Sequence, residues 1–211
     1  MQFDMKALDR GRRYKIIGSC ITPRPIAWVS SLSADGTLNV SPFSFFNALG
    51  DNPPVVPLGM VAHPEARLKD TPSNIQTTGE FVINLVNEGN AEAMNLTSVD
   101  APQGFDESAL AGLHMAPSIA VKPPRIATAP VSFECRLVHW LETGPHQVAI
   151  IAEVVQAHIA DEFLLDRDRI TIDVPAMKLI ARLHGAGWYG RRTCSRCCDR
   201  AGPITKVRLR R

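Results

Sequence analysis

The chain has 211 residues, of which 45% are hydrophobic and 21% charged, and its formal net charge is +2. These values are typical of one soluble globular domain that buries a core of its own without disulfide staples. No segment approaches the roughly 20 apolar residues that a membrane-spanning helix needs. Residues 1–14 carry alternating charges and no apolar stretch, so we expect no signal peptide.

The five cysteines do not form the pattern of a disulfide-stapled protein. They are odd in number, sparse over the body of the chain and clustered near its end, at positions 20, 135, 194, 197 and 198. We therefore expect a protein of the reducing cytoplasm. Cys194 and Cys197 form a CxxC pair, but a zinc site needs a second ligand pair at suitable spacing and only His184 lies near. We predict no metal site.

Charge is distributed unevenly along the chain. Residues 191–211 contain eight Lys or Arg and one acid, for a net charge of +7, whereas the preceding 190 residues hold 15 basic and 20 acidic residues, for −5. We predict one domain over residues 1–190 and a basic, Cys-containing tail over residues 191–211 that is disordered or divergent. A basic tail can bind nucleic acid nonspecifically, but the acidic body and the absence of interleaved aromatic residues disfavour that function.

The first predicted elements form a hairpin. Ile26–Leu32 is a run of apolar and small residues with the length of a strand, and Asp35-Gly36 supplies residues that tolerate the positive φ of a tight turn. Residues 37–41 then alternate polar and apolar, which predicts a second strand with one wet face. A third strand is predicted over residues 55–62, where Pro57 indicates an edge or a bulge.

A short helix is predicted next. Thr71 fits its N-cap, Pro72 its first position and Gly79 its end. Further strands are predicted over residues 80–86, 131–142 and 147–158, with shorter extended pieces after residue 170. There is no strand–helix alternation and no long amphipathic helix. These elements predict a mainly antiparallel barrel with small helical decorations.

Three groups of residues suggest ligand binding, each with a plainer alternative. Lys69 and the helix start at Thr71–Asn74 suit an anion such as a phosphate, or form an ordinary capped helix beside a solvated lysine. Arg24, Trp28 and Ser30 could wall an aromatic ring, or form a core Trp with a rim Arg. The third group is Ser41, Ser44 and Asn47, small polar residues threaded through Pro42 and three phenylalanines, which suits a flat aromatic ligand with a polar tail.

The sequence resembles the flavin reductase-like, FMN-binding split-barrel family, and most closely its flavoredoxin-like and nitrilotriacetate-monooxygenase-component branch. The matching blocks are Ile-Thr-Pro-Arg-Pro-Ile-Ala-Trp-Val-Ser-Ser from residue 21, Ser-Pro-Phe-Ser-Phe-Phe-Asn from residue 41, Lys-Asp-Thr from residue 69, and Gly-Glu-Phe-Val-Ile-Asn from residue 79. The resemblance covers about residues 14–189, and the chain departs from the family pattern after Tyr189. It implies a mainly β, six-stranded antiparallel Greek-key split barrel with short helices.

The resemblance also implies a homodimer that holds FMN in clefts at its interface. By position, Thr22, Arg24, Trp28, Ser30 and Ser31 would line the ring and ribityl region, and Asn39, Ser41, Ser44 and Asn47 would donate hydrogen bonds to ring or ribityl oxygens. Lys69, Thr71 and Asn74 would hold the phosphate. His184 and Tyr189 would close the site near the ring.

The function implied is that of an FMN-dependent NAD(P)H oxidoreductase, in which the flavin carries out the redox chemistry and the protein supplies position and electrostatics. NADH or NADPH would be the electron donor, and free flavin, a monooxygenase or another acceptor would receive the electrons. No acid–base residue is predicted. The alternative in the same fold is a non-enzymatic FMN-binding electron-transfer protein of the flavoredoxin type.

Overall fold

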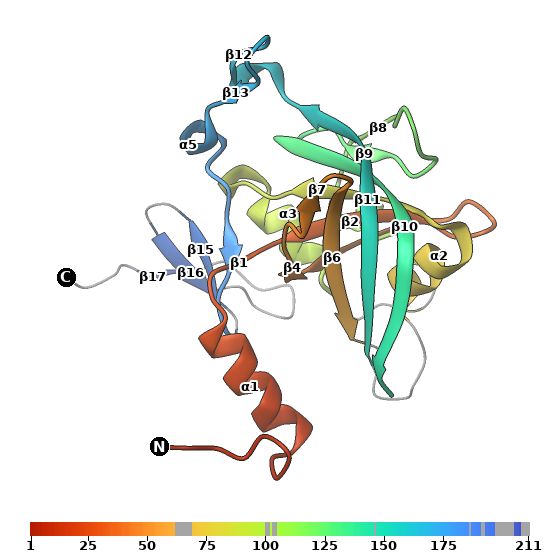
Figure 1. The fold of residues 1–211 in the computed structure, drawn as a ribbon. Helices are drawn as coiled ribbons and strands as arrows, with labels where there is room; N and C mark the ends of the chain where they lie inside the picture. Colours follow the sequence, from red (N-terminus) through yellow and green to blue (C-terminus); the bar gives the residue numbers. More distant parts are fainter. Residues whose placement is uncertain are drawn as a thin grey trace.

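The computed structural model describes residues 1–61, 69–99, 102, 105–145, 147–185, 187–190, 193–196 and 205–207, the last three ranges by their backbone only. The largest part of the fold is one antiparallel sheet that curls into a split barrel (Figure 1). Its six long strands are β2 (Ala27–Leu32), β3 (Leu38–Phe43), β6 (Pro54–Val61), β7 (Glu80–Leu85), β10 (Val131–Gly144) and β11 (Gln147–Ile159). Their order across the sheet is β3-β2-β7-β10-β11-β6, so the predicted six-stranded Greek-key barrel is confirmed.

The barrel closes because one strand bends. The backbone of β3 pairs with β2, and after Ser44 the two-residue strand β4 (Phe45–Phe46) pairs with Gly59 and Leu58 of β6 at the opposite edge of the sheet. A Cβ atom on Gly59 would lie 2.9 Å from the Cβ of Phe45, so glycine allows the close approach of these two strands. The short β5 (Gly50–Asp51) also pairs with β6.

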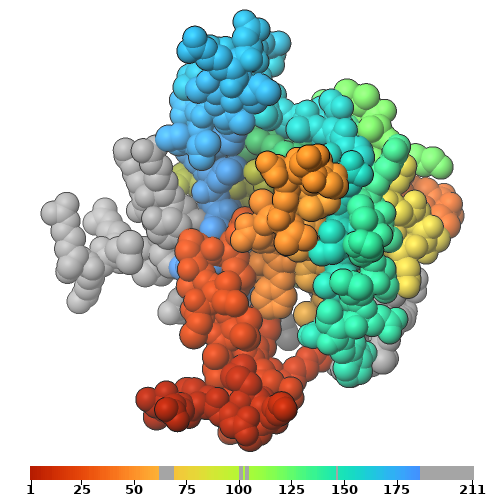
Figure 2. Space-filling view, in the orientation of Figure 1, coloured from red at the N-terminus to blue at the C-terminus, as the bar shows by residue number. Residues whose placement is uncertain are grey.

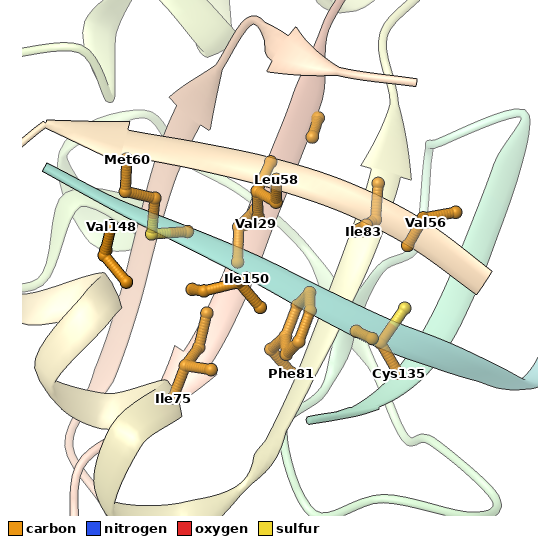
Figure 3. Packing of buried hydrophobic residues seen from close by; sticks show 12 residues of the cluster. Val29, Val56, Leu58, Met60, Ile75, Phe81, Ile83, Cys135, Val148 and Ile150 are labelled. Atoms are coloured by element: carbon orange, nitrogen blue, oxygen red, sulfur yellow. The ribbon is translucent and has the colours of Figure 1, made fainter. Parts of the chain in front are cut away.

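The barrel interior is an apolar core that receives side chains from all the strands around it. Figure 3 shows Leu58, Phe81, Ile83 and Ile150 converging there, and Ile75 of α2 (Asp70–Thr78) closes one end. A second buried cluster lies on the other face of β2 and includes Trp28, Val40 and Met94. Since β2 is buried on both faces, its sequence consists of apolar and small residues and does not alternate between polar and apolar.

The predicted hairpin is confirmed, and Gly36 takes a positive φ of 89° in its turn. Gly79 ends α2 in the left-handed region, also as predicted, but the N-cap is Lys69 and not Thr71. The strand that contains Pro57 is an interior strand. Pro57 is tolerated because β5 pairs with β6 before this residue and β4 pairs with β6 after it, and neither strand pairs with Pro57 itself.

The remaining helices are short. They are α1 (Arg10–Cys20), α3 (Ala91–Leu96), α4 (Glu107–Leu110), α5 (Val174–Met177), η1 (Glu88–Asn90) and η2 (Asp161–Phe163). The N-terminal segment that contains α1 projects from the body of the molecule, in red in Figure 2, and the sequence did not predict a helix of this length. Asp9 is its N-cap and accepts a hydrogen bond from Arg12 N at 2.9 Å.

Short strands complete the structure. β1 (Arg24–Pro25), β14 (Ala181–Arg182), β15 (Gly187–Gly190), β16 (Thr193–Arg196) and β17 (Thr205–Val207) form a second sheet. Two-stranded ribbons are formed by β8 (Met115–Ala116) with β9 (Arg125–Ile126) and by β12 (Leu164–Asp166) with β13 (Thr171–Ile172). Most of the predicted tail lies outside the described residues. No helix of the described part of the chain is long and apolar enough to span a membrane.

Candidate functional site

A polar cluster lies where the β2–β3 hairpin meets the start of α2. Register places Ser31 opposite Asn39, and Ser41 lies on the same face of β3 two residues further on. The side chain of Asn74 donates to Ser31 Oγ at 3.1 Å, and Thr71 Oγ1 donates to Asn39 Oδ1 at 2.5 Å. The structure therefore brings together four of the residues predicted to bind the ribityl chain and the phosphate.

Most of this cluster faces the protein and not solvent. Ser31, Asn39, Thr71 and Asn74 are at most 6% exposed, and the hydrogen bonds among them use their polar atoms. In this structure they form a supporting layer that fixes α2 against the hairpin. The prediction that they bind the ribityl chain and the phosphate stays a prediction. Lys69 is exposed beside them, at the positive end of the helix dipole.

Glu107 belongs to this cluster and was missed by the sequence analysis. It is the first residue of α4 and is 6% exposed, and Asn39 Nδ2 lies 3.1 Å and 3.0 Å from its two carboxylate oxygens. Burial raises the pKa of Glu107, while hydrogen bonds from the backbone and from Asn39 partly oppose the increase. The local signal was only that of a short helix, with Asp106 as N-cap, and nothing in it pointed to Asn39.

A second cluster forms around Arg24, on the opposite side of the bend in β3–β4. One guanidinium nitrogen of Arg24 donates to the carbonyl oxygens of Gly18 and Ile21, both at 2.6 Å, and so caps the C-terminal end of α1. Arg24 Nε lies 3.5 Å from Ser44 Oγ, and the guanidinium carbon lies 5.7 Å from the ring centroid of Phe45. Desolvation lowers the pKa of Arg24.

His184 joins the second cluster. Its ring packs against Gly18, where an added Cβ would lie 3.1 Å from His184 Nδ1, and its centroid lies 6.2 Å from that of Tyr14. Thr22 is exposed near the end of α1. The Tyr189 side chain lies outside the described part of the structure, although its backbone belongs to β15. The prediction that His184 and Tyr189 close the ring site stays a prediction.

Trp28 and Ser30 are core residues in this structure. Both have no exposed surface, and Trp28 Nε1 donates to Thr97 Oγ1 at 2.8 Å. Ser30 Oγ donates to the carbonyl of Pro124 at 2.6 Å. Trp28 is thus a core residue, as in the plainer alternative, but Arg24 is buried as well and not at a rim. The prediction that Trp28 and Ser30 line the ring stays a prediction.

The predicted residues that retain accessible surface are Thr22, Ser41, Ser44, Asn47, Lys69 and His184. Ser41, Ser44 and Asn47 lie along the β3–β4 strand and directly after it, whereas Thr22 and His184 lie near the Arg24 cluster and Lys69 lies at the start of α2. A separate groove of about 350 Å³ lies beside β1, with apolar walls that include Ile26, Val86 and Ile180. It contains none of the predicted binding residues, so we place the candidate site on the β3–β4 strand, where the polar groups are.

The chemistry of these groups is that of binding rather than of proton transfer. Hydroxyls, a lysine and a helix N-terminus suit a ligand with hydroxyl groups and an anionic end. Within the described residues, no three His, Cys, Asp or Glu side chains group closely enough to hold a metal ion. Cys197 and Cys198 of the tail lie outside those residues.

Comparison with known proteins identifies the family of the chain. The family model described as a flavin reductase like domain matches residues 19–171. An uncharacterised protein of Aquifex aeolicus is 38% identical over 185 residues, covering 88% of this chain and 93% of its own. The crystal structure of 2-nitrobenzoate 2-nitroreductase from Pseudomonas fluorescens is 30% identical, with a TM-score of 0.82 and coverage of 90% of this chain and 91% of its own. Nitrilotriacetate monooxygenase component B from Bacillus cereus is 29% identical, with a TM-score of 0.85 and coverage of 90% and 95%. The chain belongs to the flavin reductase-like family and is a flavin-related oxidoreductase with a split-barrel fold.

Proposed function

We propose that this chain binds FMN along the β3–β4 strand and uses it to transfer electrons from NADH or NADPH to an acceptor. The observation that carries the proposal is the row of accessible polar groups on this strand. One end of this row lies beside the start of α2. Ser44 and the Phe45 ring would face the isoalloxazine, Ser41 the ribityl chain, and Lys69 with the first turn of α2 the phosphate. The donor types fit the ligand, because its ring is apolar and its tail carries hydroxyls and an anion.

When bound, the flavin would supply the redox chemistry. The residues of the chain would bind and orient it. Lys69 would offset the charge of the phosphate, and the α2 N-terminus would offer backbone N–H groups that lack an intrahelical partner. Asn39, Thr71, Asn74 and Ser31 would hold that end of the site rigid from behind. Arg24 would keep α1 docked beside the ring region.

A homodimer would complete the cleft. Tyr14, Ile17 and Ile21 of the projecting N-terminal segment are 42–57% exposed, which leaves a strip of apolar surface for a second subunit to cover. We further propose an electron-acceptor partner, and one of the similar structures is by name a monooxygenase component. Light scattering of the purified protein would test the dimer, with a monomer mass at micromolar concentration as the contrary result.

The visible absorption spectrum of the purified protein tests the function. It would be recorded anaerobically after loading with FMN or FAD, before and after addition of NADH and then NADPH. Retention of FMN and bleaching by one nucleotide would support the proposal and identify the electron donor. A bound flavin that ignores both nucleotides would favour the electron-transfer alternative. Failure to retain either flavin would overturn the proposal.

A further inference from the structure

Among the residues that the structure describes, no basic side chain forms an ion pair with the buried carboxylate of Glu107. None of the ion pairs between described residues involves Glu107, and its hydrogen-bond donors are neutral: the Asn39 amide and, at 3.4 Å, the backbone N–H of Val40. The charged group that acts on it most clearly is Asp70 of α2, a second acid. A buried charge is ordinarily paired or hydrogen-bonded throughout, because its desolvation is costly.

The position of Glu107 connects it to the start of α2. Asn39 gives its NH₂ group to Glu107 and its oxygen to the Thr71 hydroxyl, so hydrogen bonds run from α4 across β3 into the first turn of α2. That turn is the end of the proposed site that receives the flavin phosphate. A helix N-terminus attracts anions through its dipole and its N–H groups, and a carboxylate placed behind it opposes that attraction.

We propose that Glu107 is a specificity-determining residue that weakens binding of the phosphate-bearing tail of the flavin through its negative charge. The inference rests on the proposed function, because it takes the start of α2 as the phosphate site. In this arrangement Lys69 attracts the phosphate from the exposed side, and Glu107 repels it from the buried side. The balance would leave FMN able to dissociate, as an exchanging cofactor must.

Glu107→Gln removes the charge while the network can keep its hydrogen bonds. If the side-chain amide of Asn39 rotates by 180°, its oxygen accepts a hydrogen bond from the new NH₂ group at position 107. The NH₂ group of Asn39 then donates to Thr71 Oγ1, which can act as an acceptor. The new amide oxygen still accepts from the N–H of Val40. The variant is therefore expected to fold. Glu92→Gln, an exposed residue of α3, makes the same change in net charge and serves as the control.

The test is to titrate FMN and riboflavin, which lacks the phosphate, into wild type, Glu107→Gln and Glu92→Gln at pH 8. Glu107→Gln is expected to bind FMN about 2- to 30-fold more tightly, the range for one charge near a helix terminus. Its affinity for riboflavin and both affinities of Glu92→Gln should not change. Thermal melts of the three proteins would verify that each is folded.

The outcomes separate this inference from the function on which it rests. An unchanged ratio of FMN to riboflavin affinity in Glu107→Gln, or a parallel loss of both affinities, would overturn the inference and leave a flavin-binding protein. If wild type and both variants bind no flavin at all, the proposed function and the inference are overturned together.

Discussion

A buried carboxylate on β10 gives the clearest stability prediction. Glu134 has no exposed surface and accepts hydrogen bonds from three successive backbone N–H groups, those of Ile119, Ala120 and Val121, at 2.8, 2.5 and 3.0 Å. His158 Nε2 of β11 lies 2.5 Å from Oε1 of Glu134, the oxygen that also accepts from Ile119. One side chain thus ties the loop before β9 to the two longest strands of the barrel.

Replacing Glu134 with Ala should leave these backbone N–H donors without an acceptor. Each buried N–H that loses its partner costs about 1–3 kcal/mol, and removal of one member of a buried pair costs about 3–5 kcal/mol. We expect Glu134→Ala to lower the free energy of unfolding by about 3–5 kcal/mol, a large share of the roughly 5–15 kcal/mol of a typical domain. Glu134→Gln, which keeps the shape and part of the acceptor capacity, should cost about 1–3 kcal/mol.

Urea unfolding followed by tryptophan fluorescence would measure the loss. With a slope near 2 kcal/mol/M, the midpoint of Glu134→Ala should fall by about 1.5–2.5 M at an unchanged slope. Glu142→Ala is the matched control, because Glu142 is an exposed glutamate of the same strand and should change stability by less than about 0.5 kcal/mol. If Glu134→Ala loses no more stability than Glu142→Ala, the reasoning from its buried hydrogen bonds is refuted.

Three further predictions concern pH, the barrel seam and α1. Burial raises the pKa of Glu134, but its hydrogen bonds lower it by more, so the folded-state pKa lies below the unfolded value of about 4.3. The stabilisation by ionised Glu134 is therefore present above the unfolded-state pKa and is lost as the pH falls through the folded-state pKa. Urea titrations should show that the free energies of unfolding of wild type and Glu134→Gln converge below about pH 4. Gly59→Ala should lower the free energy of unfolding by about 1–3 kcal/mol, measured by thermal melting, because the new methyl group meets Phe45. An unchanged stability would mean that the pairing of β4 with β6 accommodates the methyl group without strain. Arg24→Ala should speed amide exchange across α1 and leave the exchange of β10 and β11 unchanged, since it removes the cap on Gly18 and Ile21; unaltered exchange in α1 would contradict that role.

Local chemistry made much of the fold predictable from the sequence. Asp35-Gly36 marked the hairpin turn and Gly79 the end of α2, since each glycine adopts a positive φ that other residues resist. The long strands β10 and β11 were also predicted, and the second of them carries a largely apolar run over residues 148–155. The barrel itself followed from the absence of strand–helix alternation.

What the sequence did not predict depended on contacts between distant residues. Thr71 and Pro72 fit the ideal start of a helix, yet the Thr71 hydroxyl bonds to Asn39 instead, and the helix begins earlier. Glu107 lies 68 residues from Asn39, so no local spacing could have paired them. Helix α1 was missed because most of it is exposed and it buries only Gly18, which leaves little apolar periodicity to detect.

The cluster around Asn39 and the cluster around Arg24 make the two ends of the candidate site chemically different. Asn39 and Ser44 are five residues apart on the strand that bends to close the barrel, a span of roughly 17 Å in extended backbone. That length matches an elongated ligand better than a compact one. Arg24 and the Phe45 ring lie at one end, and Lys69 with the α2 start lies at the other, with Glu107 behind it. A ligand that carries a ring at one end and an anion at the other would therefore have only one favourable orientation, and the strength of its binding would be adjusted at the anionic end without disturbing the ring.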